Sequence, residues 1–292
     1  MDIRRIFIAA LLLIATGCKP SHTNTIVVGS KNFTEQLILS ELFAQEIESE
    51  LHVPVERRFY LAGTYIAQQA MLAGRIDLYA EYTGTALTAI LKQKPEGSRE
   101  QVYQIVKDEY AKQFKFEVAP PLGFNDTFAI EIRGDDARRL QLHSISEAAR
   151  FTPGWRAGFG YEFMERPDGF KGLVATYGLK FAAPPRIMDL GLLTRALKDK
   201  QVDLIAGNNT DGLIPALDLF VLDDDRHYFP PYEAVPIIRR EALSQYPDLG
   251  NAIGKLTGKI SDEEMRQLNF AVDGQHRDPK QVVSEFRQRK GL

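Results

Sequence analysis

The sequence IDLYAEYTGTA, at residues 76–86, gives the clearest indication of how this chain folds. Its apolar start predicts a buried strand over residues 76–80. A Thr-Gly-Thr corner follows, which predicts a helix that begins near Thr83. In open α/β sheets, ligands bind where strands end and helices begin. We therefore expect Tyr82 and Thr85 to present an aromatic ring and a hydroxyl group to a binding site.

A similar stretch, VDLIAGNNTDG, recurs at residues 202–212. Asp77 corresponds to Asp203 and both runs close on Thr and Gly, which favours two similar lobes that offer strand ends to a common cleft. From residue 25 to about residue 114, strand and helix patterns alternate. This alternation predicts an α/β fold with mostly parallel sheets covered by helices.

Composition places the chain among ordinary globular proteins. It has 292 residues, a formal net charge of −3 and 44% hydrophobic residues, which allows two lobes with a core each. The mildly acidic balance gives no support for nucleic-acid binding. Cys18 is the sole cysteine, which excludes an internal disulfide bond and a cysteine-based metal cluster. The five histidines are scattered without metal-ligand spacing, so we expect neither a metal nor a cofactor.

The N-terminus has the pattern of an export signal. Arg4 and Arg5 precede an apolar run at residues 6–15, which is shorter than the ~20 residues that a membrane-spanning helix needs. A basic start, a short apolar run and small residues before a cleavage point are typical of a secretory signal peptide. We therefore expect a signal peptide at residues 1–17 and a protein that works outside the cytoplasm.

Cys18 lies directly after this signal and resembles the cysteine of a bacterial lipobox. One departure is Ala15, where leucine is the usual residue of that motif. We expect lipid modification of Cys18 after cleavage, with residues 18–24 as a polar tether from the membrane. The alternative is an ordinary signal peptide followed by an incidental cysteine.

The first strand and helix of the folded part enclose a polar loop. A strand is predicted at residues 26–28, and GSKNFTEQ follows at residues 29–36. Asn32 is suited to cap the next helix, with Glu35 completing a capping box. Lys31 lies in the loop beside free backbone N–H groups, a combination that favours a carboxylate site. The alternative is a solvated lysine without a binding role.

Further signals mark helix starts and the points where the chain changes lobe. The sequence PPLG at residues 120–123 suits a crossover between lobes, and the acidic run at residues 223–225 is expected to mark the return. A helix is predicted over residues 64–72. Capping boxes are predicted for Ser98 with Gln101, Ser144 with Glu147, and Ser261 with Glu264.

Several segments together carry a family resemblance. They are GSKNFTEQ (29–36), IDLYAEYTGTA (76–86), GFNDT (123–127), ERPDG (165–169), TDGLI (210–214), FPPYEAVP (229–236) and the tail around residues 259–273. In this order they resemble the solute-binding proteins of osmoprotectant ABC transporters, which bind glycine betaine, choline, carnitine and related quaternary amines. The resemblance runs from residue 25 to residue 292.

The resemblance implies a type II periplasmic-binding-protein fold with two lobes and two crossovers. Lobe 1 would contain residues 25–122 and 225–292, and lobe 2 would contain residues 123–224. It also implies a monomeric binding component that delivers its solute to an ABC permease with a separate ATPase subunit. The lipid anchor would hold this component at the membrane.

The resemblance also implies the residues of the site. A quaternary ammonium has no N–H group, so aromatic faces hold it, at ~0.5–2 kcal/mol or more each. Matched by motif, the cage falls on Tyr82, Phe128, Asn208 and Tyr232. The groups for a ligand carboxylate fall on Lys31, Thr85 and Arg166. The alternative is that these aromatic residues belong only to the core.

Two of these positions bear on the choice of ligand. Asn208 stands where an aromatic residue is frequent in the family, and Phe128 lacks a phenol hydroxyl. Weak affinity for glycine betaine is one consequence. Another is a preference for a larger ligand with a polar group of its own, such as carnitine or ergothioneine.

The sequence disfavours two other classes of protein. An enzyme has little support, because the sequence contains no GxSxG, no HExxH and no P-loop. A cytosolic regulatory protein with a ligand-binding lobe of this fold is disfavoured by the export signal and by the absence of a helix-turn-helix pattern.

Overall fold

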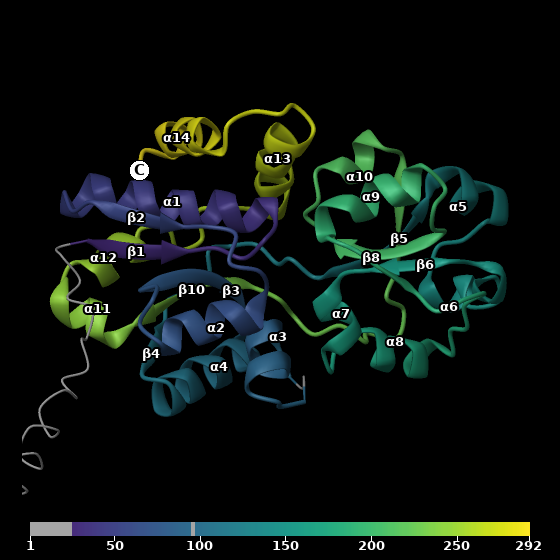
Figure 1. The fold of residues 1–292 in the computed structure, drawn as a ribbon, viewed down its shortest axis with the longest axis horizontal. Helices are drawn as coiled ribbons and strands as arrows, with labels where there is room; N and C mark the ends of the chain where they lie inside the picture. Colours follow the sequence, from purple (N-terminus) through teal and green to yellow (C-terminus); the bar gives the residue numbers. More distant parts are fainter. Residues whose placement is uncertain (1–24, 95–96) are drawn as a thin grey trace, which may run out of the picture.

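The computed structural model describes residues 25–94 and 97–292, which form two lobes that lie side by side (Figure 1). Each lobe contains a five-stranded sheet with helices on both faces, so the predicted α/β class is confirmed. The signal peptide, Cys18 and the tether at residues 18–24 lie outside the described residues. Within the described ranges, no helix is long and apolar enough to cross a membrane.

The sheet of lobe 1 has the strand order β2-β1-β3-β10-β4. Its strands are β1 (Ile26–Gly29), β2 (Val55–Arg58), β3 (Leu78–Tyr82), β4 (Phe116–Val118) and β10 (Ala234–Arg239). Strand β1 pairs in parallel with β2 and β3, whereas β10 is antiparallel to both of its neighbours. Four strands therefore share one direction, and β10 alone opposes them.

The helices of lobe 1 cover both faces of this sheet. Helices α1, α12, α13 and α14 enclose one apolar core, and α2 and α4 enclose the other (Figure 1). The helices are α1 (Thr34–Leu51), α2 (Thr64–Leu72), α3 (Thr83–Thr85), a π-helical turn (Ala86–Ile90), α4 (Arg99–Gln113), α11 (Arg240–Gln245), α12 (Leu249–Gly254), α13 (Asp262–Asp273) and α14 (Pro279–Lys290). The helix predicted at residues 64–72 is therefore confirmed as α2.

Lobe 2 repeats this plan with the strand order β7-β6-β8-β5-β9. Its strands are β5 (Phe128–Arg133), β6 (Ala157–Phe159), β7 (Arg186–Ile187), β8 (Leu204–Asn208) and β9 (Leu219–Leu222). Its helices are α5 (Gly134–Leu140), α6 (Ile145–Ala148), a 3-10 turn (Thr152–Gly154), α7 (Tyr161–Glu165), α8 (Phe170–Tyr177), α9 (Leu190–Lys198) and α10 (Leu213–Ala216). Here β5 is the strand that opposes the others.

The two opposing strands are the first strands after each change of lobe. The chain passes from β4 to β5 and returns from β9 to β10, and the two crossovers lie together where Asn125 bridges to Glu233. Gly123 has a φ of +117°, which glycine adopts readily, and a Cβ there would lie 2.7 Å from Ile260 O. Two crossovers were predicted and are confirmed, whereas the expected lobe boundaries stay a prediction.

Local capping signals were accurate where the helix start faces solvent. Capping boxes begin α4 at Ser98, α6 at Ser144 and α13 at Ser261, and in each the side chain and the backbone exchange hydrogen bonds as predicted. The serine hydroxyl satisfies a backbone N–H that has no partner within the helix.

The capping prediction for Asn32 with Glu35 is wrong. Helix α1 begins at Thr34, and its N-cap is Phe33, which makes no side-chain cap hydrogen bond. The Glu35 carboxyl group is buried and accepts hydrogen bonds from Tyr82 and Thr210 instead. Tertiary partners therefore replace the local partner that a solvent-exposed helix start would use.

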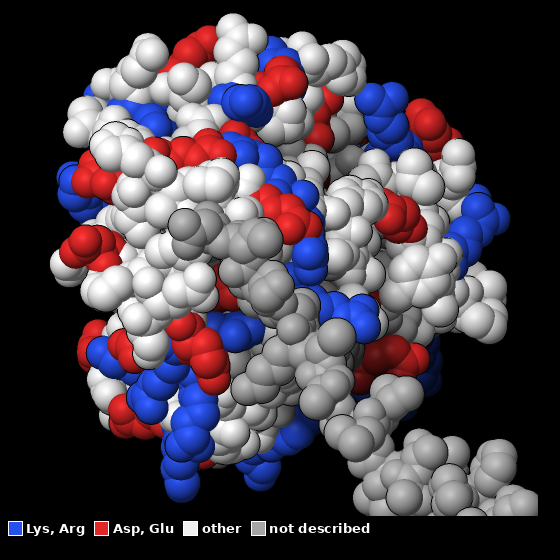
Figure 2. Space-filling model, turned by 60° about the vertical axis from the view of Figure 1, so that its left-hand side comes forward, with Lys and Arg blue, Asp and Glu red and all other residues white. Residues whose placement is uncertain are grey.

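Charge on the surface is mixed in sign. On the face shown in Figure 2, basic and acidic side chains are interspersed. This pattern agrees with the small net charge of −3.

Candidate functional site: a cavity between the lobes

A cavity of about 400 Å³ lies between the two lobes, and we call it the interlobe cavity. Its walls come from the ends of β3 and β8, the start of β5, the loop before α1, and helices α2 and α7. All of the side chains predicted to bind ligand line it: Lys31, Tyr82, Thr85, Phe128, Arg166, Asn208 and Tyr232. The fold thus brings together residues as far apart in the chain as Lys31 and Tyr232, and their binding roles stay a prediction.

Strand pairing positions the aromatic residues. Tyr82 ends β3 opposite Ala234 of β10, and Phe128 begins β5 opposite Asn208 at the end of β8. Gly84 is required beside this wall, because a Cβ there would lie 2.7 Å from the ring of Tyr232. The Thr-Gly-Thr corner therefore allows the tyrosine ring to pack against the helix start.

Tyr82 is tied firmly into the wall of lobe 1. Its side chain is only 4% exposed, and its hydroxyl donates to Glu35 Oε1 at 2.6 Å. Lys31 Nζ lies 4.6 Å from the ring centroid, and the Phe33 ring stacks at 6.4 Å. Burial, and then the charge of Glu35, raises the pKa of Tyr82 well above its ordinary range. This residue is part of the core as well as part of the cavity wall.

Lys31 is paired within the protein. Its Nζ donates to Glu81 Oε1 at 2.6 Å and to Thr64 Oγ1 at 3.3 Å, and both charged side chains are buried. A buried carboxylate at this distance neutralises the ammonium group. Lys31 was expected to face a ligand carboxylate, and in the structure its charge already has a partner.

Arg166 is paired in the same way. Its Nε and Nη2 donate to the two carboxylate oxygens of Asp168 at 2.9 and 2.6 Å, in the two-bond geometry expected for a ligand carboxylate. Tyr232 Oη donates to the same group at 2.5 Å. Burial alone would raise the pKa of Asp168, but Arg166 and Tyr232 hold it below its ordinary value.

Phe128 is the half-buried member of the aromatic wall. Its ring meets those of Phe163 at 4.9 Å, Phe229 at 5.6 Å and Tyr232 at 5.7 Å between centroids. The Arg166 guanidinium carbon lies 5.0 Å from its centroid. Aromatic rings of both lobes therefore converge on one end of the cavity.

Acidic groups outnumber free cations around the cavity. Its lining includes Asp126, Glu162 and Asp189, whereas both lining cations are paired with Glu81 and Asp168. Asp126 is buried, and its Oδ2 accepts from Asn208 Nδ2 at 2.9 Å. An aromatic cavity with this excess of carboxyl groups is suited to a cation. Among the described residues, no cluster of histidine, cysteine or acidic side chains has the arrangement of a metal site.

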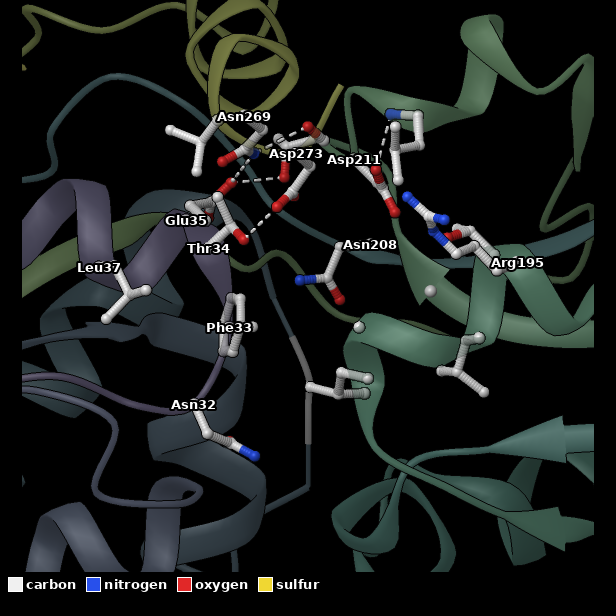
Figure 3. Close-up of a pocket in the computed structure, with 18 of the residues that line it drawn as sticks. Asn32, Phe33, Thr34, Glu35, Leu37, Arg195, Asn208, Asp211, Asn269 and Asp273 are labelled. Atoms are coloured by element: carbon white, nitrogen blue, oxygen red, sulfur yellow. Dashed lines mark hydrogen bonds between the residues drawn. The ribbon is translucent and has the colours of Figure 1, made fainter. Parts of the chain in front are cut away.

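A second cavity of about 330 Å³, the side cavity, adjoins the first. Figure 3 shows Glu35, Asn269 and Asp273 on one side of it and Asp211 and Arg195 on the other, with Asn208 between them. Asn208 also lines the interlobe cavity, so it stands where the two cavities meet. Burial raises the pKa of Asp211 to about 6.

Some lining residues were missed by sequence reasoning. Phe33 and Asp126 lie inside two of the quoted motifs, GSKNFTEQ and GFNDT, and that position was the available signal. Tyr65, Glu162 and Phe163 lie in helices α2 and α7, where helical periodicity does not distinguish a cavity wall from a solvent face.

The family described as the substrate binding domain of ABC-type glycine betaine transport systems matches residues 24–289. The chain belongs to this family. The match covers nearly the whole chain, including every residue that lines the interlobe cavity.

Relatives of this substrate-binding domain are named as transport binding proteins. The carnitine transport binding protein OpuCC of Listeria monocytogenes is 35% identical over 94% of this chain and 89% of its own length. The ergothioneine transport permease/ergothioneine binding protein EgtU of Helicobacter pylori is 33% identical over 98% of this chain. The chain spans only 52% of the length of the Helicobacter protein.

A solved structure confirms the fold of this substrate-binding domain. The crystal structure of a glycine betaine/carnitine/choline ABC transporter protein is 32% identical, with a TM-score of 0.75. The match covers 91% of this chain and 98% of that one. The two-lobed binding-protein fold that the motifs implied is therefore confirmed.

Proposed function

We propose that this substrate-binding domain captures a quaternary-ammonium solute in the interlobe cavity and delivers it to an ABC permease. The solute would be glycine betaine, choline, carnitine or a related compound. The protein would work outside the cytoplasm as a lipid-anchored monomer without turning the solute over, and ATP hydrolysis would belong to a separate subunit. The lobes would comprise residues 25–122 with 225–292, and residues 123–224.

One observation carries this proposal: an aromatic cavity whose own cations are neutralised. Tyr82, Phe128 and Tyr232 line it, while Glu81 and Asp168 pair with Lys31 and Arg166. A quaternary ammonium would gain ring contacts there without facing an unpaired cation. Lys31, Thr85 and Arg166 line the same cavity, so a ligand carboxylate would lie beside them and share Lys31 and Arg166 with Glu81 and Asp168.

A larger ligand is the second candidate. Asn208 lies at the junction of the interlobe cavity and the side cavity, which together offer more room than a trimethylammonium head requires. The polar group of carnitine or ergothioneine would bond to the Asn208 amide. The name of the Helicobacter relative supports including ergothioneine among the ligands tested.

Calorimetric titration with glycine betaine, choline, carnitine and ergothioneine tests the proposal. We expect saturable binding of at least one of them, together with a raised midpoint of thermal unfolding, because a ligand that binds only the native state stabilises it. A panel without any binding, or turnover of a bound solute, would reject the function.

Replacing Phe128 with alanine should weaken binding of the solute by about 1–3 kcal/mol, because a half-buried ring of the cavity wall is lost. Affinity is measured by titration and corrected for the folded fraction. Phe151→Ala is the matched control, since Phe151 is also half-buried and stacks on Trp155 outside both cavities. Equal effects of the two variants would mean that Phe128 acts only through packing.

Replacing Cys18 with serine should abolish lipid labelling and leave either soluble protein or an unprocessed precursor. The reason is that a thiol is the group that accepts the lipid in a lipobox. Fractionation and mass spectrometry of the N-terminus provide the measurement. A Cys18→Ser protein that is still processed and bound to membranes would exclude the lipid anchor.

A further inference from the structure

Two carboxyl groups meet beside the interlobe cavity, and we call them the carboxyl pair: Glu35 and Asp126. Glu35 comes from α1 of lobe 1, and Asp126 comes from the crossover that leads into β5. Thr210, from the loop after β8 of lobe 2, lies between them. Its Oγ1 is 2.6 Å from Glu35 Oε2 and 2.8 Å from Asp126 Oδ1.

The hydrogen-bond arithmetic at Thr210 requires a proton on the carboxyl pair. A hydroxyl group carries one hydrogen and donates it to one acceptor. If Thr210 donates to Glu35, the 2.8 Å contact with Asp126 Oδ1 is a hydrogen bond only when Asp126 is the donor. The consistent arrangement is a chain in which a protonated Asp126 donates to Thr210, and Thr210 donates to an ionised Glu35.

The other groups around the pair fit this assignment. Tyr82 Oη and Asn269 Nδ2 donate to Glu35 at 2.6 and 3.1 Å, which favours the ionised form of Glu35. Asp126 receives one further donor, Asn208 Nδ2. Glu35 therefore has more donors than Asp126.

Most charges beyond these contacts also favour a proton on the carboxyl pair. Asp211 and Asp273 add negative charge near the pair, whereas Lys31, whose charge lowers the pKa of Asp126, is itself bound to Glu81. Burial, and then the charge of Glu35, raises the pKa of Asp126 well above its ordinary range. Burial also raises the pKa of Glu35. A pair so placed holds a proton more tightly than either group alone.

We propose that the carboxyl pair senses the net charge of the ligand. With an empty cavity or a zwitterionic ligand the pair keeps its shared proton, and a ligand with a net positive charge expels it. Asp126 is thus a specificity residue of the interlobe cavity, which it lines next to Asn208. This inference rests on the proposed function.

The proton balance is simple. The O–H bond on Asp126 breaks, the proton passes to the buffer, and the carboxylate left behind becomes the counter-ion of the ligand's ammonium group. Choline brings one positive charge and no carboxylate. Glycine betaine carries its own carboxylate, so it supplies no net charge to displace the proton. Linkage is reciprocal: a ligand that releases a proton binds more tightly as the pH rises.

Titration calorimetry with choline chloride and with glycine betaine measures this coupling. Each ligand is titrated between pH 5 and 8 in buffers with different ionisation enthalpies, which yields the number of protons released. We expect choline to release about one proton and its Kd to fall about tenfold per pH unit until the pair is fully ionised. Glycine betaine should release almost none, and its Kd should stay nearly constant.

Three variants assign the proton. Asp126→Asn keeps the size and polar contacts of a protonated Asp126, so choline should bind it without proton release at every pH. Glu35→Gln removes the negative neighbour, so the pH dependence of choline binding should move to lower pH. Asp211→Asn is the control, because Asp211 is a partly buried carboxyl group nearby that lines only the side cavity. It should still release about one proton on binding choline, with the pH dependence moved only slightly to lower pH, because one neighbouring negative charge is lost.

The outcomes are distinct. Equal proton release with both ligands, retention of the release in Asp126→Asn, or its loss in Asp211→Asn would each overturn the carboxyl pair as the sensor. Binding of glycine betaine without binding of choline at any pH would also contradict it, since no carboxylate would then accept a cation. Failure of both ligands, and of the wider panel, would instead reject the proposed function.

Discussion

Replacing Arg166 with alanine should lower the free energy of unfolding by about 3–5 kcal/mol, because the change leaves the Asp168 carboxylate buried and unpaired. The two side chains are only 5% and 2% exposed. Chemical denaturation of the ligand-free protein at pH 7 is the measurement, so that loss of ligand binding does not enter the result.

Two further variants test whether the unpaired charge of Asp168 causes the loss of stability. Adding Asp168→Asn to Arg166→Ala should recover part of the loss, since an amide carries no charge and still accepts a hydrogen bond from Tyr232. Arg138→Ala is the matched control, because Arg138 also makes bidentate contacts with an aspartate, Asp218, but at the solvent-exposed surface. We expect no measurable loss there. Unchanged stability of Arg166→Ala would mean that Asp168 is solvated in the native protein.

Glu131 is a buried carboxyl group in the core of lobe 2. It lies in β5 with both carboxyl oxygens buried, and neither has a hydrogen-bond partner among the described residues. The carboxyl group occupies the space beside Gly207, where any Cβ would collide with it. Burial, and then the charge of Asp211, raises the pKa of Glu131 well above its ordinary range.

Replacing Glu131 with glutamine should therefore stabilise the protein increasingly as the pH rises. The native state holds a proton on Glu131 that the unfolded chain loses near the ordinary pKa of glutamate, so unmodified protein loses about 1.4 kcal/mol per pH unit from that value up to the native pKa. Below the ordinary pKa of glutamate, Glu131 is protonated in both the native and the unfolded state, so the stability of the two proteins should differ little. Denaturation at several pH values between 4 and 8 gives the comparison.

Glu147→Gln is a control of opposite sign. The backbone N–H groups of His143 and Ser144 hold the pKa of Glu147 below its ordinary value, so its contribution is present at neutral pH and is lost as the pH falls. This variant should be less stable than unmodified protein at neutral pH and not at acid pH. A Glu131→Gln protein without any gain at pH 8 would show that the Glu131 carboxyl group reaches water.

The elements that sequence reasoning located correctly are those with local causes. Helix α2 has the predicted bounds, and Ser98, Ser144 and Ser261 begin helices through contacts three residues away. The strand predicted at residues 76–80 was found as Leu78–Tyr82, so its position was right within two residues. Such features depend on short stretches of chain and therefore appear in the sequence itself.

The charge pairs of the site, by contrast, were not located from the sequence. The partner of Lys31 is Glu81, 50 positions away, and Glu35 meets Thr210 across 175 positions. Asp168 lies only two positions from Arg166, yet sequence reasoning left that arginine free for a ligand. A pairing of this kind depends on which side chains folding removes from water together, and no local pattern records it.

Local sequence patterns were sufficient for the two-lobed α/β architecture, because strand ends and helix starts have their own residue preferences. The family resemblance implied the two crossovers and most of the residues that line the interlobe cavity. Which of those residues carry an unpaired charge depended on the tertiary structure. Burial makes an unpaired charge costly, so Lys31 and Arg166 acquired carboxylate partners and Glu35 turned from its own helix toward Thr210.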